Sequence, residues 1–107
     1  MQSNLSVTSY RPTFGINVSE KVIDLGSKCN SETGRKLYKK IDKLKTYGFK
    51  NHTIEYKQNI DPSGKSRHVF YAEKDGEECT LISEYTIQKA INQLINLTKY
   101  DLQLKIK

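Results

Sequence analysis

The chain has 107 residues, of which 36% are hydrophobic, and its formal net charge is +6 at neutral pH. This length suits one domain with a single modest core, and the basic charge predicts an anionic partner. There is neither a secretory signal pattern nor an apolar stretch long enough to span a membrane, and Cys29 and Cys79 are too few for a disulfide framework. The sequence therefore predicts an intracellular, cytoplasmic protein with no membrane partner.

The N-terminal quarter of the chain carries weak signals. Residues 1–20 are mostly polar, so we expect a tail or an added edge strand there. Alternating apolar residues allow a strand at 13–18, and a strand is predicted at 21–27, where Gly26 marks the turn toward a helix. We expect residues 21–107 to form a single domain.

A helix is predicted from Ser31 to about Gly48. Ser31 is a suitable N-cap, and Glu32 suits the positive end of the helix dipole. Apolar residues recur at i, i+4 and i+7 and therefore form one stripe, which consists of Leu37, Ile41 and Leu44. This stripe should pack against the rest of the protein.

The opposite side of this helix is basic. At about 100° per residue, five cations fall within an arc of roughly 140°; they are Arg35, Lys36, Lys39, Lys40 and Lys43. Asp42 interrupts the arc, and the Glu partners at i, i+4 that stabilise an ordinary solvated helix are missing. A strip of cations matches a phosphate backbone better than a small ligand, the alternative being a solvated helix face.

Three strands are predicted next, at 52–60, 68–74 and 77–83, as an antiparallel meander. The turns between them are Asp61–Pro62–Ser63–Gly64 and the two-residue hairpin turn Asp75–Gly76. Neighbouring residues of a strand point to opposite faces, so one of Phe70 and Tyr71 should lie on the outer side of the sheet.

The period changes again from Glu84, where an amphipathic helix with Ser83 as its N-cap is predicted. Beyond Thr98, Leu102 and Leu104 alternate with polar residues, which favours a strand over an extension of the helix.

The predicted fold class is α+β: a two-layer sandwich in which two helices cover one face of an antiparallel-rich sheet. The predicted order is β-α-β-β-β-α, with an extra C-terminal strand allowed.

This order and the Lys-rich first helix resemble the ribosome hibernation-promoting factors, also called ribosome-associated inhibitors. The likeness covers roughly residues 21–105 and lies in IDLGSKCNSETGRKLYKKIDKLKTYGFKNHTIEY and SEYTIQKAINQLINLTKYDLQLK. In the second stretch, the positions of the family's Tyr-x-x-Ala-Ile-Asp segment are matched by Tyr85, Ala90, Ile91 and Leu94.

The resemblance implies binding to the small ribosomal subunit, in the channel of messenger and transfer RNA, so that translation is blocked by occupancy. The family's basic first-helix positions, which would contact rRNA phosphates, are matched by Lys39, Lys40, Lys43 and Lys45. From the residues themselves, Lys65 and Arg67 in the turn between two strands are candidates for a secondary RNA contact. Glu84 and its neighbours replace the Lys cluster of double-stranded RNA-binding domains, which argues against ordinary duplex binding.

Other kinds of site are weakly supported. The four residues His52, His68, Cys29 and Cys79 lack the paired spacing of zinc sites, and no cofactor is expected. A small ribonuclease using His68 with Lys65 or Tyr71 is conceivable, but no catalytic segment stands out, so we expect a protein that is not an enzyme.

A protein–protein interaction module, either an inhibitor or an adaptor, is the alternative. Such a module would use the open face of the sheet or an edge strand. The acidic hairpin at 73–78 and the alternating C-terminus favour it.

Overall fold

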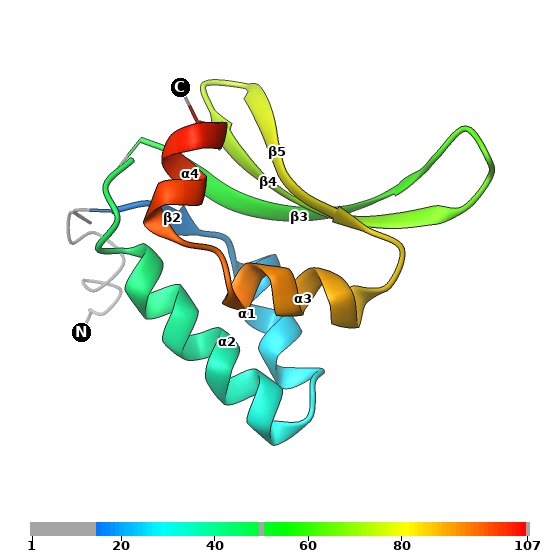
Figure 1. Ribbon diagram of the computed structural model, residues 1–107, viewed down its shortest axis with the longest axis horizontal. Helices are drawn as coiled ribbons and strands as arrows, with labels where there is room; N and C mark the ends of the chain where they lie inside the picture. Colours follow the sequence, from blue (N-terminus) through cyan, green and yellow to red (C-terminus); the bar gives the residue numbers. More distant parts are fainter. Residues whose placement is uncertain (1–14, 50, 107) are drawn as a thin grey trace, which may run out of the picture.

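The computed structural model of the protein describes residues 15–49 and 51–106, and its sheet confirms the predicted meander (Figure 1). Strand order in the four-stranded sheet is β2-β3-β4-β5, with β2 parallel to β3 and the other neighbours antiparallel. The strands are β2 (Asn17–Val18), β3 (Thr53–Ile60), β4 (Ser66–Lys74) and β5 (Glu77–Glu84). The short β2 is therefore a strand added at one edge of the sheet, and the predictions for residues 1–14 lie outside the described residues.

The turn between β4 and β5 explains the register of this hairpin. Asp75 and Gly76 both have positive φ, 54° and 85°, as the common two-residue hairpin turn requires. Lys74 consequently pairs with Glu77, and the antiparallel register continues to a bulge between Phe70 and Tyr71.

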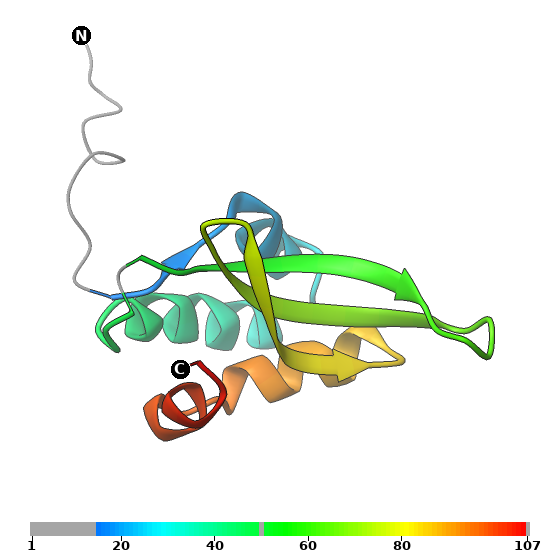
Figure 2. The ribbon, with the colours of Figure 1, turned by 90° about the horizontal axis from the view of Figure 1, so that it is seen from above.

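Four helices are observed in the described residues: α1 (Glu20–Ser27), α2 (Ser31–Leu44), α3 (Ile87–Ile95) and α4 (Lys99–Lys105). In Figure 1, α1, α2 and α3 lie below the strands, and Figure 2 shows α3 followed directly by α4. The α+β class and the helical layer on one face of the sheet are therefore as predicted, with two helices more than expected.

One core joins the sheet to these helices. On β4, Phe70 is fully buried while its neighbour Tyr71 is half-buried on the other face, as the alternation predicted. Phe70 pairs with Tyr56 and Ile82 across the sheet. The same cluster receives the apolar stripe of α2, together with Leu94 of α3 and Leu102 of α4.

The predicted strand at 21–27 is wrong, because these residues form helix α1. Val22, Leu25 and Gly26 are its buried residues, and their spacing of i, i+3 and i+4 is the helical period. Gly26 is not a turn; it lies inside the helix, where a Cβ would come within 2.6 Å of the Tyr38 ring. The β-branched Val22 and Ile23 favoured a strand locally, and packing against α2 overrode that preference.

The favoured C-terminal strand is also wrong, because residues 99–105 form α4. Thr98 and Asp101 make a reciprocal capping box that starts this helix. Leu102 faces the core, whereas Leu104 is 57% exposed. The alternation of apolar residues was thus accidental, and the Thr-x-x-Asp spacing was the informative signal.

The caps and ends of the other helices also differ from the predictions. The N-caps are Asn30 for α2 and Thr86 for α3, in place of Ser31 and Ser83. In both cases the cap side chain accepts a hydrogen bond from the backbone three residues later. Helix α2 ends at Leu44, short of the predicted Gly48.

Candidate nucleic-acid interface

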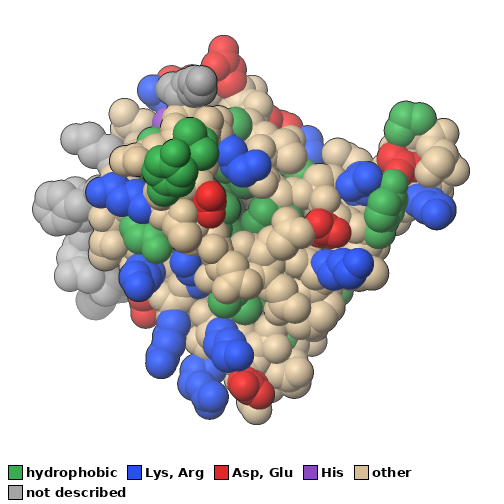
Figure 3. Space-filling view, in the orientation of Figure 1, with side chains coloured by type: hydrophobic (Ala, Val, Ile, Leu, Met, Phe, Trp, Pro, Cys, Tyr) green, Lys and Arg blue, Asp and Glu red, His purple; other side chains and the backbone are tan. Residues whose placement is uncertain are grey.

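Helix α2 presents its basic side to solvent as predicted. Its stripe of Leu37, Ile41 and Leu44 is buried, at 4% exposure or less. Arg35, Lys36, Lys39 and Lys43 are exposed on the other side, and Lys45 is exposed at the C-cap. Figure 3 shows Lys and Arg side chains gathered over the position that α2 occupies in Figure 1. The structure therefore brings together the five predicted cations of the arc, which we call the basic face: Arg35, Lys36, Lys39, Lys40 and Lys43. Lys45 lies apart from them, because at about 100° per residue it is roughly 150° from the middle of this arc.

Part of the basic face borders a shallow hollow. This hollow has a volume of about 240 Å³ and lies between α2 and Ile95 of α3. Its cationic lining consists of Lys36, Lys39, Lys40 and Lys43. Four positive charges around one concave surface raise the local potential and attract an anion.

Lys40 differs from its neighbours because it is half-buried. Its Nζ donates to the carbonyl oxygen of Leu97, 2.5 Å away, and lies 5.7 Å from the ring centroid of Tyr47. Lys40 thus ties α2 to the end of α3, and we assign it a structural role in addition to its charge.

Lys36 also has a partner. Its Nζ lies 3.5 Å from a carboxylate oxygen of Glu32, one turn earlier on the helix. The expectation that the helix lacks Glu partners at i, i+4 is therefore wrong for this pair. Exposed pairs of this kind contribute little to stability and are screened by salt, so Lys36 remains attracted to an anion.

Three cations of the basic face, Arg35, Lys39 and Lys43, form no ion pair among the described residues, and neither does Lys45. Asp42 is exposed on the same helix, so it lowers the positive potential nearby without pairing with any of them. The charges of the three cations are directed at solvent or at a ligand.

A second hollow, of about 560 Å³, opens where α1 crosses α2. Helices approach closely there, since a Cβ on Gly34 would lie only 2.6 Å from the carbonyl oxygen of Gly26. Arg35, Tyr38 and Lys39 line this crossing hollow on the α2 side. Tyr38 is 42% exposed and was not predicted as a site residue. In the sequence, the only signal for this hollow was the presence of Gly26 and Gly34. The crossing itself was not predicted, because α1 was expected to be a strand.

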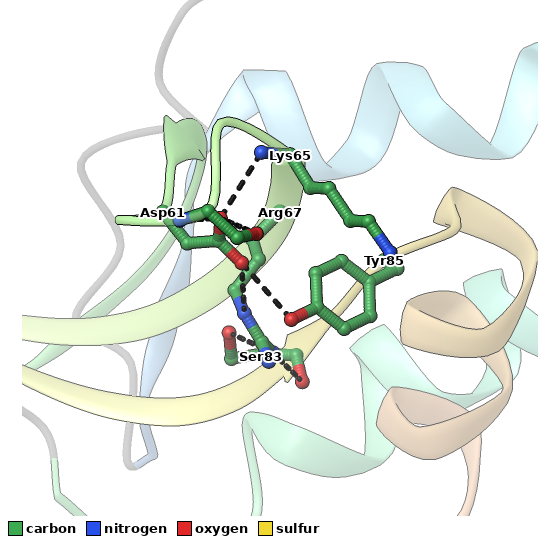
Figure 4. A network of polar contacts seen from close by, with 6 residues as sticks. Asp61, Lys65, Arg67, Ser83 and Tyr85 are labelled. Carbon is green, nitrogen blue, oxygen red and sulfur yellow. Dashed lines mark hydrogen bonds and ion pairs between the residues drawn. The ribbon is translucent and has the colours of Figure 1, made fainter.

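The secondary pair, Lys65 and Arg67, lies elsewhere. Both residues belong to the β3–β4 hairpin, whose tip projects away from α2 in Figures 1 and 2. In Figure 4 they surround Tyr85, with the Arg67 guanidinium carbon 4.0 Å and the Lys65 Nζ 5.7 Å from its ring centroid. Arg67 also donates to the carbonyl and hydroxyl oxygens of Ser83. The structure therefore separates this pair from the basic face.

Asp61 is the acidic residue that lies beside Arg67 and Tyr85 in the β3–β4 hairpin. It accepts hydrogen bonds from the hydroxyl of Ser63, the amide of Lys65 and the hydroxyl of Tyr85, and it lies 3.6 Å from Nε of Arg67. The bond from the Ser63 hydroxyl is the largest cause that lowers the pKa of Asp61 from its ordinary value of 3.8 to about 2. A carboxylate that is charged and fully bonded here fixes the turn and partly neutralises Arg67.

The side chains of His68, Cys29 and Cys79 each form a hydrogen bond within the fold. Nδ1 of His68 and the hydroxyl of Tyr56 form a hydrogen bond of 2.6 Å. The tyrosine bonded to His68 is therefore Tyr56 and not Tyr71, the residue considered for a ribonuclease. The thiol of Cys29 donates to the carbonyl of Leu25, and burial raises its pKa. The thiol of Cys79 donates to the carbonyl of Lys105. Within residues 15–49 and 51–106, no three His, Cys, Asp or Glu side chains are grouped to hold a metal ion.

Comparison with known proteins gives no match to this chain among protein families, curated proteins or solved structures. In the part of the chain that the structure describes, none of the helices combines the length and the apolar character needed to cross a membrane.

Proposed function

We propose that this protein binds RNA through the basic face of α2. The observation that carries the proposal is that Arg35, Lys39 and Lys43 are exposed on one side of one helix and form no ion pair among the described residues. A 14-residue helix is about 21 Å long, so its cations can contact several successive phosphates of one strand.

The target that we propose is a cytoplasmic RNA, with the small ribosomal subunit as the first to be tested. Support for the subunit comes from the sequence resemblance to hibernation-promoting factors, which act by occupying the RNA channel. Occupancy requires a charged, rigid surface and no reaction chemistry. A helix tied to its neighbours by Lys40 and packed through a buried stripe supplies such a surface.

A charge-matched pair of variants tests the role of the helix. Replacing Arg35, Lys39 and Lys43 together by Gln should weaken RNA binding at least about tenfold, because three phosphate contacts are lost. The control replaces three exposed lysines on other elements by Gln, namely Lys21, Lys74 and Lys89, and should lose far less. Lys40 stays in place in both variants because of its structural bond. Equal binding by the two variants would exclude the basic face as the interface.

A protein-interaction module is the second candidate, and α4 favours it. Tyr100 and Leu104 are 66% and 57% exposed, and they lie one turn apart on the same side of this helix. Exposed aromatic and aliphatic residues of this kind suit contact with a protein. Changing both residues to Ser should abolish binding to a protein partner recovered from cells and leave RNA binding intact if the two surfaces are independent.

A further inference from the structure

The crossing hollow between α1 and α2 suggests how the proposed interface would hold RNA, and this inference rests on that proposed function. We infer that the hollow receives one unpaired base of a single RNA strand, stacked against Tyr38, while Arg35 and Lys39 hold the adjacent phosphates.

Two glycines place the Tyr38 ring at the crossing of the helices. Gly26 and Gly34 let the two helices approach until Gly34 lies against the backbone of α1, and this approach brings Tyr38 against Gly26. A Cβ on Gly26 would come within 2.6 Å of the Tyr38 ring, so the ring rests against the α1 backbone. An aromatic ring that is supported by this contact and still 42% exposed is a suitable platform for stacking.

The charges around the hollow separate the place for a base from the place for phosphates. Arg35 and Lys39 line the hollow on the same side of α2 as the basic face, so a strand lying along the helix passes them. Asp42 also lines the hollow and is exposed. Its negative charge opposes a phosphate inside the hollow, whereas its oxygens can accept hydrogen bonds from the amino groups of a base.

The volume of the hollow fits this occupant. About 560 Å³ is within the range of about 300–1,000 Å³ typical of pockets for small molecules. Bases of a duplex are stacked and paired inside the helix, so they cannot reach Tyr38 without unpairing. The interface should consequently prefer single-stranded RNA to a duplex of the same sequence.

The test uses the full chain and two RNA probes of mixed sequence. One is a single strand of about 12 nucleotides that carries 2-aminopurine, a base whose fluorescence is quenched by stacking, and the other is its duplex. We expect the wild-type protein to bind the strand more tightly than the duplex and to quench the fluorescence. Tyr38→Leu keeps an apolar side chain over Gly26 but removes the ring, so it should weaken strand binding roughly fivefold to a hundredfold and abolish the quenching. Tyr38→Phe should retain both.

The matched control is Tyr100→Leu, which alters an exposed tyrosine on α4 and should leave strand binding and quenching unchanged. If Tyr38→Leu binds the strand as tightly as the wild type, or loses strand and duplex binding equally, the inference about the base is wrong and RNA binding stands. If the wild-type protein binds neither probe, the proposed function itself is wrong.

Discussion

Two adjacent lysines of α2 have different surroundings. Lys39 is exposed, whereas Lys40 is half-buried and donates to the carbonyl oxygen of Leu97, 57 residues later in the chain. Leu97 is only 5% exposed, so water cannot easily replace this donor. A buried carbonyl that loses its partner costs free energy, which makes Lys40 a stability residue within a binding surface.

Replacing Lys40 by Met keeps the long apolar part of the side chain and removes the donor. We expect the free energy of unfolding to fall by about 1–3 kcal/mol, because the Leu97 carbonyl is left unpaired. Lys39→Met serves as the control and should change stability by no more than about 0.5 kcal/mol. Urea unfolding of the two variants measures the difference. Equal stabilities would mean that the Lys40–Leu97 bond contributes nothing.

The hairpin carboxylate Asp61 predicts a dependence of stability on pH. Its pKa is lowered on folding from 3.8 to about 2, so the folded state binds a proton less readily than the unfolded state. The stability that this group contributes is complete above pH 3.8 and is lost as the pH falls toward 2. Asp101, whose pKa is lowered chiefly by its bond to the Thr98 amide, acts in the same direction.

Urea unfolding at pH 5 and at pH 2.5 tests this prediction. Asp61→Asn should reduce the loss of stability between the two pH values, and the part that remains includes the contribution of Asp101. A loss as large in Asp61→Asn as in the wild type would contradict the assigned role of Asp61.

At the level of elements, the crossing of α1 and α2 depends on two glycines that do different things. A Cβ on Gly34 would meet the backbone of α1, and a Cβ on Gly26 would meet a side chain, the ring of Tyr38. Alanine is the better helix former by about 1 kcal/mol, so steric overlap must outweigh propensity for either change to destabilise.

We expect Gly34→Ala to lower the free energy of unfolding by about 1–3 kcal/mol, since the two helices must move apart. Gly26→Ala should destabilise much less, because its Cβ meets only the far end of the Tyr38 side chain, which can move aside, and alanine favours the helix. Thermal unfolding of the two variants and the wild type checks this difference. Equal losses of stability would contradict the distinction between a backbone contact and a side-chain contact.

The elements that the sequence predicted correctly carry their signals locally. The period of Leu37, Ile41 and Leu44 identified α2, and Asp75–Gly76 identified the β4–β5 turn. Helix α1 was missed because β-branched Val22 and Ile23 favour a strand, while the reason for a helix lies in α2. Helix α4 was missed although its capping box is local, because the alternation of Leu102 and Leu104 received more weight than Thr98.

Across the whole molecule, the charges are distributed between separate surfaces. The basic face covers α2, whereas the outer face of the sheet carries mixed charges, as in the pair formed by Lys57 and Glu78 at 2.6 Å. Sequence periodicity predicted the basic face, because exposure on a helix follows from its spacing. It did not reveal the hydrogen bond from Lys40 to Leu97, the packing of Tyr38 against α1 or the separation of Arg67 from the basic face. Each of these depends on contacts between elements that are distant in sequence.

The dependence of RNA affinity on salt tests the central claim most directly. Binding of the wild-type chain to a single-stranded RNA is measured between about 50 and 200 mM salt. Three phosphate contacts, made by Arg35, Lys39 and Lys43, predict that the logarithm of the association constant falls against the logarithm of the salt concentration with a slope of about −2. A slope near zero, or no binding at the lowest salt concentration, would contradict an RNA interface on α2.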